Sequence, residues 1–268
     1  MTRRDSVRFG CCVGKPEQLS ALERAGADYC ELPASRLAGL DDEGFGAWVA
    51  ALDGSPVPAR AANGFLPGQV RLTGPEPTTI SEQDAYVAGC LDRLRRLGVE
   101  RLVFGSGTAR AVPAGFEREK ALEQLAAFMR RASAAATERG ITLVLEPLRR
   151  AESNVFNSVA EGAEFLRRGA CGSTRLLADL FHMMEEGEPM TVLEESRDLL
   201  SHVHVADGHA RRAPGTQDYD FDSFFRHLAT AGYEGRCSIE CGWGDFDAEV
   251  GPGLQFIRSS AARVANEG

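Results

Sequence analysis

A regular alternation of strand-like and helix-like segments, repeated eight times, constrains the fold of this 268-residue chain more than any other feature. The strand-like segments are short apolar runs, and most helix-like segments begin after a cap residue or end before a glycine. The predicted strands are residues 7–14, 29–33, 57–65, 101–105, 141–146, 175–180, 202–206 and 236–240. The predicted helices are residues 16–25, 41–52, 81–97, 116–139, 158–168, 191–199, 221–231 and 248–264. Right-handed crossovers would place all these helices outside one closed parallel barrel.

The pattern therefore predicts an α/β chain with a single (β/α)8 TIM barrel domain over residues 1–268. An open, doubly wound sheet is the competing architecture, but no glycine-rich nucleotide-binding motif follows the first strand. Asp41, Ser81 and Asp220 are predicted helix caps. Thr191 and Glu194 have the spacing of a capping box.

The charge and cysteine content restrict the partners and the compartment. A net charge of −9 disfavours nucleic acids and anionic membranes, and the short arginine clusters are interpreted as solvated helix faces. The seven cysteines show no C-x-x-C spacing, which favours a reducing, cytoplasmic location and buried thiols. The N-terminus lacks a signal peptide pattern, and no apolar run reaches the roughly 18 residues of a membrane span. A soluble cytoplasmic protein is expected.

Four polar residues stand at the ends of consecutive predicted strands: Glu146, Asp179, His204 and Glu240. In a parallel barrel these ends open at one face, where chemistry is carried out. Taken singly, such a carboxylate is explained as a helix cap, and such a histidine as a hydrogen-bonded core residue. Asp179 ends an apolar strand, however, and a buried carboxylate needs a cation or hydrogen bonds beside it. Three carboxylates and one imidazole together predict a site for Mn²⁺, Mg²⁺, Co²⁺ or Zn²⁺.

At these residues the sequence resembles the xylose-isomerase-like TIM barrels, in particular the sugar phosphate isomerase/epimerase family and its metal-dependent ketose 3-epimerases. The resemblance covers nearly the whole chain and is strongest over residues 142–242. It rests on a glutamate ending strand five, a D-x-x-H after strand six, an H-x-H on strand seven, an arginine before Pro-Gly, and a glutamate ending strand eight. These are Glu146, Asp179 with His182, His202 with His204, Arg211 before Pro214-Gly215, and Glu240.

The resemblance implies that Glu146, Asp179, His204 and Glu240 bind one divalent metal, with Mn²⁺ favoured. It also implies that Glu146 and Glu240 exchange a proton with a small keto sugar through a metal-stabilised enediolate. Glu152, His182 and Arg211 match the positions that contact the substrate in the family. We add Asn63, which precedes the proline- and glycine-rich loop 66–80, and Trp243, which offers apolar surface to a sugar.

Several of these assignments have alternatives. Glu152 is otherwise a solvated loop charge, and His182 a donor that orients Asp179. Asn63 is otherwise a turn former, and Glu31, at the end of strand two, an ion-pair partner for Arg36. The spacing leaves open whether Arg211 or Arg212 contacts the substrate. Two further residues of the same loop, Asp207 and His209, are candidates for holding sugar hydroxyls.

The reaction itself also has alternatives. The same barrel supports metal-dependent dehydratases and lyases that act on keto-inositols or 3-oxo-glycosides. An endonuclease IV-like repair nuclease is disfavoured, because such enzymes draw zinc-binding histidines from early strands and this chain has none before strand six. The loop 241–249 holds three acids and no base, which predicts an unphosphorylated substrate, although Arg211 and Arg212 argue for a phosphate. The oligomeric state is open, a homo-oligomer included.

Overall fold

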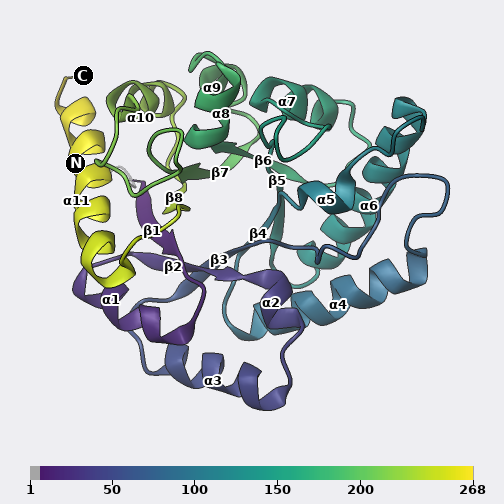
Figure 1. Ribbon diagram of the computed structural model, residues 1–268, viewed down its shortest axis with the longest axis horizontal. Helices are drawn as coiled ribbons and strands as arrows, with labels where there is room; N and C mark the ends of the chain where they lie inside the picture. Colours follow the sequence, from purple (N-terminus) through teal and green to yellow (C-terminus); the bar gives the residue numbers. More distant parts are fainter. Residues whose placement is uncertain (1–6, 268) are drawn as a thin grey trace.

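The computed structural model, which describes residues 7–267, contains a closed barrel of eight parallel strands. Each strand pairs with the next in sequence, and β8 pairs with β1 to close the ring, as Figure 1 shows in a view along the barrel. The strands are β1 (Arg8–Cys12), β2 (Tyr29–Pro33), β3 (Ala59–Asn63), β4 (Arg101–Phe104), β5 (Thr142–Leu145), β6 (Arg175–Asp179), β7 (Leu200–Val205) and β8 (Arg236–Ile239). The predicted (β/α)8 fold is confirmed.

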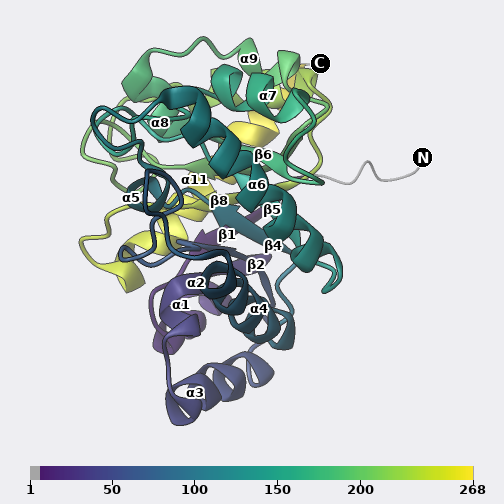
Figure 2. The ribbon, with the colours of Figure 1, turned by 90° about the vertical axis from the view of Figure 1, so that its right-hand side faces the viewer.

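Helices surround the barrel in both views (Figures 1 and 2). The longer ones follow the predicted order and are α1 (Leu19–Arg24), α3 (Asp42–Asp53), α4 (Ile80–Arg96), α6 (Arg118–Thr137), α7 (Val159–Arg167), α10 (Phe221–Thr230) and α11 (Phe246–Glu267). The 3₁₀ turn η1 (Pro16–Gln18) lies inside the predicted helix 16–25. Short helices that the pattern did not predict stand beside strand ends: α2 (Ala34–Ala38), α5 (Gly107–Arg110) and α8 (Leu180–Glu186). Two of them, α5 and α8, carry residues of the candidate site.

The helix caps are partly as predicted. The side chains of Asp41 and Asp220 accept hydrogen bonds from the backbone of the first helical turn. Ser81 is not the cap of α4; Thr79 is, because Thr79 and Glu82 form the reciprocal capping box. The predicted box at Thr191 is wrong, since Thr191 is already helical (φ −57°, ψ −23°) and its side chain caps nothing. The helix there, α9 (Val192–Glu195), is four residues long.

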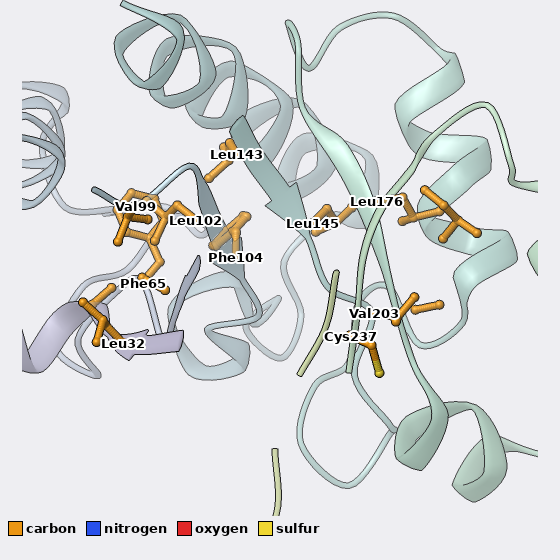
Figure 3. Close-up of a cluster of buried hydrophobic side chains, with 14 of the residues drawn as sticks. Leu32, Phe65, Val99, Leu102, Phe104, Leu143, Leu145, Leu176, Val203 and Cys237 are labelled. Carbon is orange, nitrogen blue, oxygen red and sulfur yellow. The ribbon is translucent and has the colours of Figure 1, made fainter. Parts of the chain in front are cut away.

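Alternation along the strands separates an outer layer of side chains from the barrel interior. Leu143, Leu145, Leu176 and Val203 belong to the large hydrophobic cluster between strands and helices, part of which Figure 3 shows. The intervening residues Val103, Val144 and Leu177 form a separate small cluster. Because successive side chains point to opposite faces of a strand, this second set fills the barrel interior.

The remaining general predictions concern thiols and membranes. All seven cysteines lie within the described residues and are free. Over residues 7–267, no helix is both long and apolar enough to cross a membrane.

Candidate metal centre

The four strand-end residues converge because each follows an inward-facing residue by two positions. Glu146 follows Val144, Asp179 follows Leu177, His204 follows His202 and Glu240 follows Ser238. A period of two carries all four side chains inward at the carboxyl end of the barrel. Glu146 and Glu240 stand one residue beyond the ends of β5 and β8, where the predicted strands had included them.

One ligand atom from each of these four residues lies within 4.8 Å of the others. The Nδ1 atom of His204 is 3.3 Å from Oε1 of Glu146 and 3.3 Å from Oε2 of Glu240. Glu146, Asp179 and His204 are buried, and Glu240 is partly exposed toward the mouth. A divalent ion with bonds of about 2.0 to 2.6 Å bridges donors at such separations.

Burial and charge give the two glutamates different acidities. Burial raises the pKa of Glu146, with a further increase from Glu240, against the opposing hydrogen bond of His204. Burial also opposes ionisation of Glu240, but the charges of His204 and Arg211 outweigh it and lower its pKa to about 2.

Arg211, and not Arg212, faces the cluster. Its Nη2 atom donates to Oδ2 of Asp179 at 3.1 Å and also contacts Oε2 of Glu240. The side chain of Arg212 instead approaches Glu249, at 3.8 Å. Arg211 has a left-handed backbone (φ 50°), which turns its side chain inward from the loop after β7. This geometry favours Arg211 over Arg212 for contact with the substrate, which stays a prediction.

His182 and Glu152 line the same mouth. Among the described residues, the buried Nε2 atom of His182 has no hydrogen-bond partner, and Oδ2 of Asp179 lies 3.5 Å away. Its Nδ1 atom accepts a bond from the backbone N–H of Arg149, so Nε2 carries the proton and presents a free donor. Glu152 accepts from Nε of Arg149 at 2.8 Å and lies 4.0 Å from Arg211. Glu152 is therefore an exposed residue that pairs with Arg149, and its contact with substrate stays a prediction.

Asn63 contacts the four-residue cluster, whereas the contact given for Trp243 is with Phe246. The side-chain amide of Asn63 donates to Oε1 of Glu240 at 2.5 Å and to Sγ of Cys12 at 3.4 Å. Asn63 thus contacts a member of the cluster directly. Trp243 packs edge-on against Phe246, with ring centroids 5.1 Å apart, at the margin of the hydrophobic core. Its position on the loop after β8 leaves its contact with substrate a prediction.

Two other sequence interpretations are wrong. Glu31 does not pair with Arg36, whose guanidinium donates to the backbone oxygen of Gly14; Glu31 is fully buried against His202 and His204. The carboxylate of Asp207 is not available to a sugar, because it accepts the backbone N–H groups of Gly215, Thr216, Gln217 and Tyr219.

Sequence reasoning did not predict that Gly105 and Arg110 contact Glu146. A Cβ at Gly105 would lie 2.3 Å from Oε2 of Glu146, so only glycine leaves room for this carboxylate. Beside it, the fully buried guanidinium of Arg110, on α5, donates to the backbone oxygens of Glu146 and Phe104. The G-S-G-x-x-R segment 105–110 is the only sequence signal of this arrangement.

A second group, Cys12, Glu31 and His204, also has ligand atoms within 4.8 Å of one another. Burial and the charges of Glu31 and Glu240 raise the pKa of the Cys12 thiol well above its ordinary value. The four-residue cluster offers three carboxylates and one imidazole, a donor set that suits Mn²⁺ or Mg²⁺.

Comparison with known proteins places this arrangement in a family. The family model described as xylose isomerase-like TIM barrel matches residues 19–260. The chain belongs to this family. Among curated members, an L-ribulose 3-epimerase from Methylomonas sp. (strain DH-1) is 30% identical over 209 residues, which cover 70% of this chain and 72% of that enzyme.

A shorter match joins the chain to 3-dehydro-D-guloside 4-epimerase from Escherichia coli (strain K12), with 34% identity over 101 residues. This alignment covers 37% of the chain and 38% of that enzyme's length. Among solved structures, D-allulose 3-epimerase from Methylomonas sp. superposes with a TM-score of 0.84 at 23% identity, over 97% of this chain and all of that one. These three relatives are all named as sugar epimerases.

Proposed function

We propose that this protein is a divalent-metal-dependent epimerase or isomerase of a small keto sugar. The observation that carries the proposal is the convergence of Glu146, Asp179, His204 and Glu240 within 4.8 Å at the barrel mouth. The relatedness to sugar epimerases supports the same reading. Mn²⁺ is the favoured ion, with Mg²⁺, Co²⁺ and Zn²⁺ as alternatives.

The residues of the cluster would have two roles: holding the metal ion and transferring a proton to and from the substrate carbon. A divalent ion at the four residues would stabilise the negative charge that develops on the substrate oxygens as the enediolate forms. One of the two glutamates, Glu146 or Glu240, removes the proton next to the carbonyl, and the other returns a proton. The two come from β5 and β8, three strands apart around the ring, so they reach the substrate from different directions.

Four polar side chains around this pair are placed to hold the sugar. His182 offers its free Nε2–H, and Arg211 brings a guanidinium between Asp179 and Glu240. Glu152 stands beside Arg211 as an acceptor for hydroxyl groups. Asn63 fixes the rotation of Glu240 and lies within reach of the same substrate. Trp243 is proposed to cover an apolar sugar face.

The test is an activity screen of Mn²⁺-reconstituted protein in D₂O over free ketoses, keto-inositols and 3-oxo-glycosides. Deuterium at the carbon whose configuration inverts identifies an epimerase, and deuterium at the neighbouring carbon an isomerase. Loss of water from the product identifies the alternative dehydratase, which uses the same proton removal but expels a β-hydroxyl. If metal-loaded protein incorporates no deuterium into any of these compounds, the proposal is wrong.

A further inference from the structure

A buried polar network lies inside the barrel next to His204. Its members are Tyr29 and Glu31 on β2, His202 on β7 and Ser238 on β8, all at most 1% exposed. Tyr29 and Ser238 are hydrogen-bonded through their hydroxyls at 2.7 Å. The other side of the barrel interior is filled by Val103, Val144 and Leu177. Burying a carboxylate in such a place is costly unless each oxygen is fully hydrogen-bonded.

Glu31 meets that requirement with three donors. Its Oε1 atom faces Nε2 of His204 at 3.0 Å, and its Oε2 atom faces Nε2 of His202 at 2.8 Å. Oε2 also accepts from the hydroxyl of Ser238 at 2.5 Å. An ionised carboxylate only accepts hydrogen bonds, so both imidazoles carry a proton on Nε2. The Nδ1 atom of His204 is then the one that points toward Glu146 and Glu240.

We propose that Glu31 is a positioning residue that holds the proton of His204 on Nε2 and so directs the Nδ1 lone pair at the metal. The inference rests on the proposed metal site. His202 and Ser238 serve this arrangement by fixing the rotation of the Glu31 carboxylate. A carboxylate behind a metal-binding histidine sets its tautomer and strengthens it as a ligand.

The alternative is that Glu31 itself binds a metal together with Cys12 and His204. That use would require His204 to present Nε2 to the ion and would remove one of the hydrogen bonds that compensate the burial of Glu31. It would also leave Nδ1 of His204 carrying a proton between two carboxylates. The two arrangements therefore differ in which ring nitrogen of His204 is free of hydrogen.

The decisive measurement is the tautomer of His204 in ¹⁵N-histidine-labelled protein loaded with Zn²⁺, a diamagnetic probe. We expect long-range ¹H–¹⁵N spectra to show a hydrogen on Nε2 and the ion on Nδ1. A hydrogen on Nδ1, or an ion on Nε2, would overturn the role of Glu31 while leaving metal binding and the proposed reaction intact. Conversely, the expected tautomer in a protein that exchanges no deuterium with any ketose would refute the proposed reaction alone.

Variants give a second readout by calorimetric titration with Mn²⁺. Glu31→Gln keeps the shape but replaces one acceptor with a donor, and we expect its Kd for Mn²⁺ to rise by about 10- to 100-fold. Ser238→Ala, which removes one of the three donors, should weaken binding less. Glu188→Gln is the matched control, because Glu188 is partly buried but caps the backbone of α7. Folded Glu31→Gln with the wild-type Kd would contradict the proposal, and the wild-type spectra decide it if that variant does not fold.

Discussion

Replacing Gly105 with alanine tests whether the position of Glu146, and not merely its presence, sustains the metal site. The new Cβ would lie 2.3 Å from Oε2 and 3.4 Å from Cδ of Glu146. Ordinary contacts of a Cβ begin near 3.4 Å, so the carboxylate must retreat by about 1 Å. The backbone tolerates alanine, since the φ of Gly105 is outside the left-handed region. The atom that must move is the end of a side chain, so the fold should survive.

We expect the substitution to weaken metal binding and to lower turnover, and to leave the fold intact. A displacement of about 1 Å in a reacting group commonly costs on the order of 10²-fold in rate. Gly105→Ala should therefore keep a cooperative thermal unfolding transition but bind Mn²⁺ more weakly and lose turnover on that scale. The measurements are circular dichroism melting, calorimetric Mn²⁺ titration, and kcat for whichever ketose the wild type converts.

Gly89→Ala is the matched control, because a Cβ there meets no atom of residues 7–267 within 4 Å and the residue lies inside α4. That change should leave metal binding intact and stabilise the protein by about 0.5–1 kcal/mol, since glycine weakens a helix interior. Folded Gly105→Ala protein with wild-type affinity and wild-type kcat would refute the argument that this glycine exists to admit Glu146.

Three further predictions concern the reaction and its specificity. Glu146→Gln and Glu240→Gln should each lower turnover by at least roughly 10²-fold, because positioned acid and base groups commonly contribute that much; a near wild-type rate would remove the residue from proton transfer. Fluorescence anisotropy at physiological salt should detect no binding to abasic duplex DNA, because the charge is −9, and tight, salt-sensitive binding would revive the nuclease alternative. The ratio of kcat/KM for a ketose phosphate to that for the free ketose should stay below ten, about 1.4 kcal/mol in transition-state binding, because the loop 241–249 is acidic.

The sequence predicted the barrel and the convergence of four strand-end residues because both follow from local periodicity. Eight alternating segments determine the topology, and a period of two along each strand determines which residues point inward. The N-cap residues of the helices were predicted less accurately than the topology. Thr79 and Glu82 have the capping-box spacing as clearly as Thr191 and Glu194, and only the backbone angles distinguish the true cap from the false one.

Contacts made across the barrel were beyond sequence reasoning. Glu31 meets His202 and His204 because closure of the ring brings β2 within three strands of β7, whereas the nearby Arg36 had seemed the simpler partner. Arg110 was missed for a similar reason. An arginine on a four-residue helix carries no periodic signal, and its burial under Glu146 depends on the packing of α5 against the end of β5.

The most direct test of the central claim is the location of the metal in crystals grown with Mn²⁺, found by anomalous scattering at the manganese edge. The account predicts one ion per chain, bound by Glu146, Asp179, Nδ1 of His204 and Glu240 at about 2.0 to 2.3 Å. An ion bound elsewhere, or two of these ligand groups more than about 6 Å apart in the loaded protein, would contradict a shared site at the barrel mouth.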